Sequence, residues 1–191
     1  MASTYPTSLD AFTNPTATSL LTSPSHAQQH ADINDAMEAV QTKLAIGNTV
    51  LGNYTAYTPT AATWAVGDGV WSAFYAQVNN FVHVYGTFTF GSTSSITTTL
   101  LIGGLPVNIN ADMISSAGGG ADWVLGACSF TDVSAGAYFY GYTCSNNATQ
   151  LRLQLTNTSS TYAGKSTPNA TVPFTWTTGD SFRFSTFYKA A

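Results

Sequence analysis

Two periodicities of apolar residues divide this chain. Between residues 26 and 45 (HAQQHADINDAMEAVQTKLA), apolar or semi-apolar positions recur at spacings of four and three, which predicts one amphipathic helix. From about residue 54 the pattern changes to short runs rich in Thr, Val, Phe and Tyr, separated by Gly, Asn, Pro and Ser. Such runs are typical of an antiparallel sandwich or barrel. We therefore expect a mainly β protein whose residues 54–191 form a jelly-roll-like β-sandwich.

The clearest alternation lies in LRLQLT (151–156) and SFRFSTFYK (181–189). Residues of one parity in a strand face the core, and those of the other parity face outward. The expected core residues are Leu151, Leu153, Leu155, Phe182, Phe184 and Tyr188. The expected outward residues are Arg152, Gln154, Arg183 and Lys189.

The segment AFYAQVNNFVHVYGTFTF (73–90) predicts a hairpin with its turn at Asn79 and Asn80, because Asn tolerates the positive φ of a tight turn. Both of its faces carry apolar bulk. One face has Phe81, His83 and Tyr85, and the other has Val82, Val84, Phe88 and Phe90. In a monomeric sandwich one face should be polar, so we infer that the second face meets another subunit.

The helix pattern matches a heptad seam. Its positions are His26, His30, Ile33, Met37, Val40 and Leu44. An ordinary amphipathic helix packed on its own β-domain would show nearly the same period over three heptads. Alone in water, a helix of about 20 residues is marginal, and association would also cover the spare sheet face. β-branched residues at d with Leu at a favour three or more strands, which predicts a homotrimer.

His26 and His30 lie one helical turn apart, and three interpretations of them stay open. They are semi-polar seam residues that form an imidazole ring on the axis, or that ring binds an anion or water, or the pair shares a transition metal. We expect the first, with no metal and no cofactor. His83 is expected to be packed in its strand.

The N-terminal segments are predicted from the positions of Pro, Gly and Ser and from scattered apolar residues. Residues 1–24 contain three prolines and no steady period, and they read as an extended arm that docks on another protein surface. The expected anchors of this arm are Tyr5, Leu9, Phe12, Leu20 and Leu21. Residues 25–46 are the trimerisation helix, with an N-cap at Ser23 or Ser25, and residues 47–53 are a linker marked by two glycines.

Composition excludes several partners. Only 7% of residues are charged, the net charge is −4, and there is no basic run, so nucleic acid is not expected to bind. No apolar run reaches the ~20 residues of a membrane span, and the first residues lack the pattern of a signal peptide, so neither membrane insertion nor Sec export is expected.

The two cysteines, Cys128 and Cys144, have no CxxC spacing. The turn residues DVSAG centre a hairpin nearer 134 than 136, which leaves the two cysteines about three residues out of cross-strand register. Two reduced cysteines are therefore favoured, while a disulfide stays open.

The order of arm, capped heptad helix and aromatic β-domain resembles the short fibre proteins of tailed bacteriophages, the head fibres or minor tail proteins. The similar segments are YPTSLDAFTNP, HAQQHADINDAMEAVQTKL, TWAVGDGVWSAFYAQVNNFVHVYGTFTFGSTSSI, GLPV and WTTGDSFRFSTFYKAA, which together cover essentially the whole chain. The resemblance implies a homotrimer on the virion surface, assembled in the host cytoplasm. Residues 1–24 would attach to the major capsid or tail protein, and residues 54–191 would point outward.

Three functions follow as hypotheses. The first is adhesion to a host-surface glycan through exposed aromatic rings, for which the candidates are Trp64, Trp71, Trp123 and Tyr140. The second is a purely structural capsid cement without receptor binding. The third is a glycan depolymerase, which we do not expect, because the aspartates of the β-domain lie in turn-like contexts and no GxSxG motif exists. The chain is thus expected to be no enzyme and to have no catalytic residues.

Overall fold

The computed structural model describes residues 26–44, 53–114, 123–157 and 164–191, without the side chains of residues 41–44. The chain divides into two compact units, residues 1–53 and residues 54–191. Each unit is described by itself. Within the described residues, no helix is both long enough and apolar enough to cross a membrane.

The first unit contains one helix, α1 (His26–Leu44), inside the predicted range 25–46. Its sequence is rich in Ala and Gln, which are good helix formers, and contains neither Gly nor Pro. The side chain of Gln28 donates a hydrogen bond of 2.8 Å to Asp32, one turn later. The predicted arm, with its five anchors, and both N-cap candidates lie outside the described residues.

The second unit is built from strands and one short 3-10 helix, η1 (Ala111–Met113). The longest strands are the expected hairpin strands and the two strands with clear alternation, together with β8 and β9. In chain order the strands are β1 (Thr55–Ala56), β2 (Thr60–Ala61), β3 (Trp64–Ala65), β4 (Val70–Val78), β5 (Phe81–Thr89), β6 (Ser95–Ile96), β7 (Leu101–Gly103), β8 (Val124–Asp132), β9 (Ala137–Asn147), β10 (Gln150–Asn157), β11 (Gly164–Ser166) and β12 (Ser181–Lys189).

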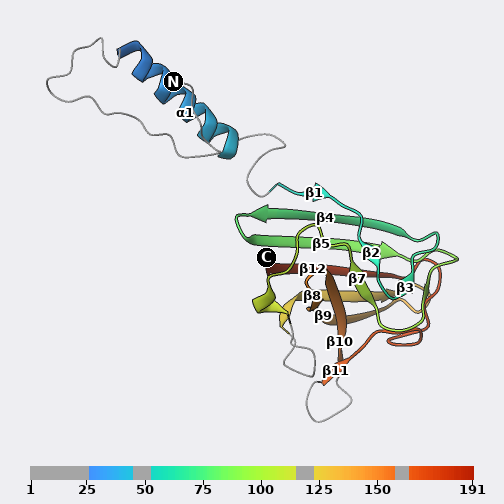
Figure 1. Ribbon diagram of the computed structural model, residues 1–191. Coiled ribbons are helices and arrows are strands. Elements are labelled where there is room, and N and C mark those ends of the chain that lie inside the picture. The colour runs from blue at the N-terminus through green and yellow to red at the C-terminus, as the bar shows by residue number, and fades with distance from the viewer. Residues whose placement is uncertain (1–25, 45–52, 115–122, 158–163) are drawn as a thin grey trace. The chain divides into compact units, whose positions relative to one another are not determined.

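Ten strands form one antiparallel sheet in the order β1-β4-β5-β12-β8-β9-β10-β7-β2, with β11 also paired to β10 (Figure 1). β3 and β6 form a separate pair. The two ends of the path, β1 and β2, are only three residues apart in the chain. The short segment Thr55–Ala61 therefore bridges both ends of the sheet, which must curl to bring them together.

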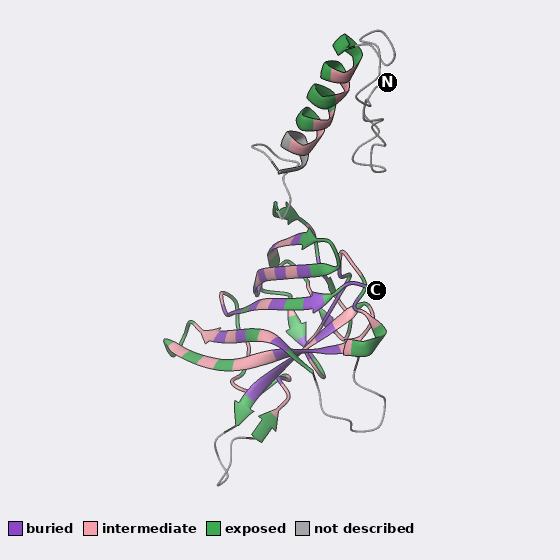
Figure 2. Cartoon of the chain, turned by 90° about the vertical axis from the view of Figure 1, so that its left-hand side faces the viewer, coloured by how far each residue is buried: buried purple, intermediate pink, exposed green. Residues whose placement is uncertain are grey.

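The inner face of the curled sheet is the core. Its buried members include the expected Leu and aromatic residues of β10 and β12 and one face of β5 (Figure 2). The predicted turn at Asn79 is confirmed, with a φ of 56°, and Val78 pairs with Phe81 across it. Of the two apolar faces of β5, the one with Val82, Val84 and Phe88 is fully buried in the core.

Small residues on the inner face allow the strands to curve tightly. One cross-strand row runs from Ala73 on β4 through Gly86, Phe184 and Cys128 to Gly141 on β9. A Cβ on Gly86 would lie 2.7 Å from the Cβ of Ala73, so no larger residue fits there. Glycines at such positions mark places where strands bend and backbones approach closely.

Two expectations about the fold are corrected by the structure. The described strands do not separate into the two stacked sheets of a sandwich, because hydrogen bonding continues along one path. Gln154 was expected to face solvent, and this is wrong: it is buried, and its Oε1 accepts a hydrogen bond of 3.3 Å from Thr167. The alternation is overridden because residues after β11 cover this part of β10.

Candidate assembly and binding surfaces

The predicted seam of α1 presents apolar side chains to solvent in the single chain. Ile33 is 56% exposed and Met37 is 55% exposed, four residues apart on the helix. His26 and His30 are exposed as well, and Val40 is half-buried. The backbone of Leu44 is helical, but its side chain lies outside the described residues. Apolar side chains of this size, exposed in a row, indicate a surface that another molecule can cover.

The outer face of β4, β5 and β12 carries a second apolar surface, which we call the aromatic patch. It consists of Tyr54, Phe74, Phe81, His83, Tyr85 and Phe187. Its three most exposed rings are Phe81 (53%), Tyr54 (47%) and Phe187 (43%). The six residues include no Asp, Glu, Lys or Arg, and His83 is the one basic side chain among them.

Strand register brings the rings of the aromatic patch together. Phe74 pairs with Tyr85 across β4 and β5, and the two rings stack with centroids 5.4 Å apart. His83 pairs with Phe187 across β5 and β12, and these rings stack with centroids 4.0 Å apart. Aromatic cross-strand pairs of this kind contribute about 0.2–1 kcal/mol each to sheet stability. The patch is therefore a rigid surface, fixed by the sheet beneath it.

Both ring nitrogens of His83 lie within hydrogen-bonding distance of a hydroxyl group. Its Nδ1 lies 2.6 Å from the hydroxyl of Tyr54, and its Nε2 lies 2.9 Å from the Oγ of Ser185. Desolvation by the surrounding rings lowers the pKa of His83 from its ordinary value. The expectation of a packed histidine is confirmed, and the neighbouring hydroxyls hold its neutral form in one orientation.

The Ser185–His83 pair resembles part of a nucleophilic site but lacks what such a site needs. A serine nucleophile requires free N–H donors near it to stabilise the oxyanion. Ser185 lies in the interior of β12, paired with Tyr85 of β5 and Ala127 of β8. Its backbone amide belongs to the sheet ladder. The hydrogen bond between Ser185 and His83 therefore positions the imidazole ring.

The environment of His83 predicts how stability depends on pH. The unfolded chain protonates this histidine near pH 6.5, whereas the folded chain resists protonation. As the pH falls below about 6.5, the unfolded state binds the extra proton, so the free energy of unfolding decreases until the folded pKa is passed. Denaturant unfolding between pH 8 and pH 5, followed by tryptophan fluorescence, should show this loss.

His83→Gln is the matched variant for that experiment, because Gln keeps a hydrogen-bonding side chain and does not titrate. Its free energy of unfolding should vary less between pH 8 and pH 5 than that of the original chain. The rings that face His83 on this side are those of Tyr54 and Tyr85. An equal slope in the variant would show that His83 does not cause the pH dependence.

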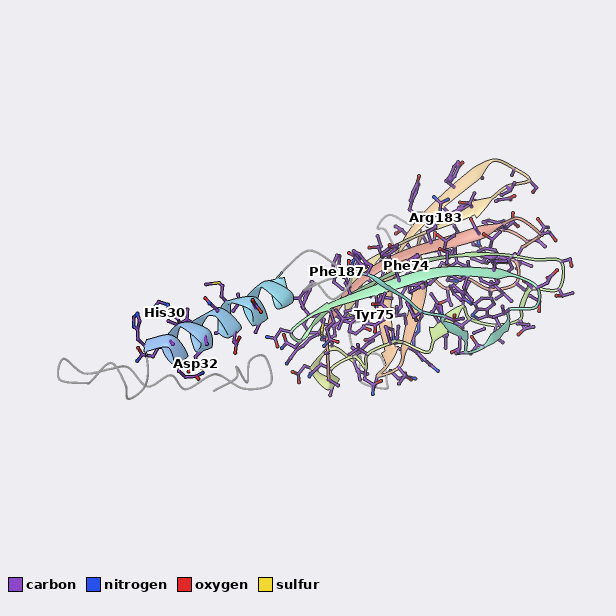
Figure 3. All side chains as sticks on the ribbon, turned by 90° about the horizontal axis from the view of Figure 1, so that it is seen from above. His30, Asp32, Phe74, Tyr75, Arg183 and Phe187 are labelled. Atoms are coloured by element: carbon purple, nitrogen blue, oxygen red, sulfur yellow. The ribbon has the colours of Figure 1, made fainter. Side chains whose placement is uncertain are left out.

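The other end of the same outer face is polar. Arg183 on β12 lies opposite Thr87 of β5 on one side and Ser129 of β8 on the other (Figure 3). Tyr140 of β9, which is 69% exposed, continues this row beyond Ser129. Exposed Tyr138 lies in the next row of the same face. Rings, hydroxyls and one guanidinium thus share a flat surface, a combination suited to polyhydroxylated ligands.

The structure divides the four predicted glycan contacts into two groups. Trp123 is 55% exposed, and Tyr140 is exposed, so both rings are accessible. Trp64 is only 8% exposed and its Nε1 donates to the carbonyl of Leu101 at 2.8 Å, which makes it a core residue. Trp71 packs against Trp64, Phe88 and Phe182. The burial of Trp64 counts against its assignment as a ligand contact, while the assignment of half-buried Trp71 stays a prediction.

Two aspartates stabilise loops, as their sequence contexts indicated. Asp68 accepts hydrogen bonds from the backbone and hydroxyl of Thr93, both at 2.8 Å, and these bonds hold the pKa of its carboxyl well below the usual range. Buried Asp180 accepts from the amides of Val133 and Thr177 at 2.9 and 2.6 Å. Both carboxylates are committed to backbone donors.

The two cysteines are free and buried, as favoured from the sequence. Cys128 lies opposite Gly141 in the β8–β9 hairpin, three residues from Cys144, so the predicted register is confirmed. Burial raises the pKa of the Cys128 thiol to about 12. The thiol is therefore protonated and unreactive in the folded protein.

The sequence missed part of these surfaces. Tyr54, Phe74 and Phe187 were not assigned to any surface, although Phe187 has the outward parity of Arg183 and Lys189. Among the described residues, no group of three or more His, Cys, Asp or Glu side chains is placed to hold a metal ion. The Gly-rich segment 116–122 lies outside those residues. No known family model, curated protein or solved structure matches this chain.

Proposed function

We propose that this protein is a homotrimeric structural protein of a tailed-bacteriophage virion, a short fibre or decoration protein whose β-domain adheres to the host surface. One observation carries the proposal: a single chain exposes two separate apolar surfaces, the seam of α1 and the aromatic patch. An ordinary monomeric protein buries such surfaces, and a self-associating protein uses them as interfaces.

Association through the helix is the first step of the proposal. Fully burying a side chain such as Ile33 or Met37 contributes about 1.5–3 kcal/mol. Three helices that pack along the seam bury these residues in every copy, which offsets the marginal stability of a single helix of 19 residues. Ile33 and Val40 at d favour three strands over two.

The aromatic patch supports the same assembly. It begins at Tyr54, ten residues after the last seam position, Leu44. Helices that associate raise the effective concentration of any surface linked to them, so a weakly self-complementary patch can then be covered as well. We assign the patch to contacts between copies of this chain, because its rings are uncharged and present little that would select a charged partner.

Adhesion is assigned to the polar end of the outer face and to Trp123. Sugars are bound by aromatic rings that cover their CH faces and by side chains that hydrogen-bond their hydroxyls. Tyr140, Tyr138 and Arg183 supply both kinds of group on one flat surface. Attachment to the capsid or tail protein is assigned to residues 1–24, which rests on the resemblance to phage fibres.

A glycan array probed with the purified full-length chain tests the adhesion step. We expect retention on bacterial surface glycans, and we expect the double variant Trp123→Ala, Tyr140→Ala to lose at least about fivefold in apparent affinity, because stacking on each ring contributes at least ~0.5 kcal/mol. Val70→Thr removes exposed apolar surface at the far edge of the sheet and should bind normally.

The array also separates the competing functions. Retention on no surface would contradict adhesion and favour a purely structural cement. Release of reducing sugar from host polysaccharide would favour a depolymerase instead. Equal retention of the double variant would remove Trp123 and Tyr140 from the binding surface.

A further inference from the structure

The first turn of α1 holds two imidazoles, both at positions of the predicted seam, that already contact each other within one chain. The Nε2 atoms of His26 and His30 lie 3.0 Å apart. The two rings are nearly perpendicular, with centroids separated by 4.4 Å. Both side chains are exposed, so solutes can reach the two nitrogens. In this contact one nitrogen donates a proton and the other accepts it.

We propose that His26 and His30 form a bidentate binding site for a divalent transition-metal ion. Metal–imidazole bonds are about 2.0–2.1 Å long. Two nitrogens 3.0 Å apart therefore subtend about 94° at an ion bound to both. This angle fits adjacent positions of an octahedral or tetragonal ion, whereas a tetrahedral ion would need the nitrogens about 3.3 Å apart.

The chemistry of the donor atoms narrows the choice of metal ion. For both Nε2 atoms to bind a metal, the ring that donates in this contact moves its proton from Nε2 to Nδ1, so that each neutral ring carries its proton on Nδ1 and offers an Nε2 lone pair. Asp32 is not a further ligand, because it lies on a different side of the helix from His30 and accepts a hydrogen bond from Gln28 (Figure 3). Two imidazoles without a carboxylate suit Cu²⁺ and Ni²⁺ better than Mg²⁺ or Ca²⁺. Water completes the coordination.

The site has a physical consequence for the helix. His26 is the first residue of α1, and helix nucleation is the costly step in forming an isolated helix. A metal that joins residues 26 and 30 closes the first turn and stabilises every helical state of the segment. The proposal goes beyond the fibre function, since the two nitrogens come from one chain and no second copy is needed.

Titration of the full-length chain with NiCl₂ at pH 7.5, followed by calorimetry and by helical circular dichroism at 222 nm, tests the site. We expect one ion per chain, an increase in helical signal, and no response to MgCl₂. His30→Gln should weaken binding at least about tenfold, because it converts a chelate to a single ligand. Ala31→Gln, a control at an exposed position of α1 outside the seam, should bind Ni²⁺ like the original chain.

Three results would overturn the proposal. The first is that the chain does not bind Ni²⁺ up to about 1 mM NiCl₂. The second is that His30→Gln binds Ni²⁺ with the affinity of the original chain. The third is a stoichiometry of one ion per three chains, which would place the metal between copies. Light scattering on the same samples reports the oligomeric state independently. A monomer that binds one ion would therefore sink the fibre assembly and leave the metal site intact.

Discussion

Replacing both Ile33 and Val40 with Asp is expected to convert the trimer into a monomer. In a three-stranded seam, each substitution brings three carboxylates to one layer, where they are desolvated and repel one another. Unpaired buried charges cost several kcal/mol each, which exceeds what the remaining seam residues contribute. Light scattering should therefore give the 20.1 kDa of one chain in place of three times that mass.

Ala31→Asp combined with Ala39→Asp is the control for this experiment. It adds the same charge to the helix at positions away from the seam, and it costs more helix propensity than the seam variant does. The control should stay trimeric. A seam variant whose mass equals that of the original chain would refute the heptad assignment, and a monomeric original chain would refute the trimer itself.

Gly141→Ala is expected to destabilise the β-unit by about 3 kcal/mol or more. A Cβ at this position would collide with the carbonyl oxygen of Gln154 and would lie 3.0 Å from the Cα of Leu155. Both atoms belong to the backbone of β10, which pairs directly with β9. Neither can move without breaking that pairing, so the cost exceeds that of ordinary overpacking. The melting temperature should fall by at least about 6 °C.

Thermal unfolding followed by tryptophan fluorescence measures this effect in the full chain, because all four tryptophans lie in residues 54–191. Gly164→Ala is the matched control: the nearest atom to its added Cβ is 4.0 Å away, and its stability should change by less than about 0.5 kcal/mol. Equal melting temperatures for the two variants would show that β10 yields at Gly141, contrary to the packing described.

Local patterns predicted the strands well. The two-residue turn at Asn79 follows from the tolerance of Asn for positive φ, and the buried leucines of β10 follow from alternation. The cysteine register could also be derived, because turn residues fix the centre of a hairpin. Each of these predictions depends on residues close together in the chain, where short-range sterics and burial decide the outcome.

Contacts between distant segments were harder to predict. Trp64 and Trp71 look like ligand-binding rings in sequence, yet they pack on Phe88 and Phe182, which come from other parts of the chain. Gln154 is covered by Thr167 only because β11 folds back on β10. The continuous sheet, in place of two stacked sheets, likewise depends on strand order, which no local period encodes.

The bridging segment Thr55–Ala61 bears on how the edges of the sheet are kept from pairing with foreign strands. Unpaired strand rims recruit foreign strands, and many soluble proteins deter this with lysines. Only five basic residues occur in this sequence. Here one short segment occupies the centre of β4 at one rim and pairs with β7 at the other. Pairing of one segment with both edges thus gives the protection that charged side chains give in other sheets.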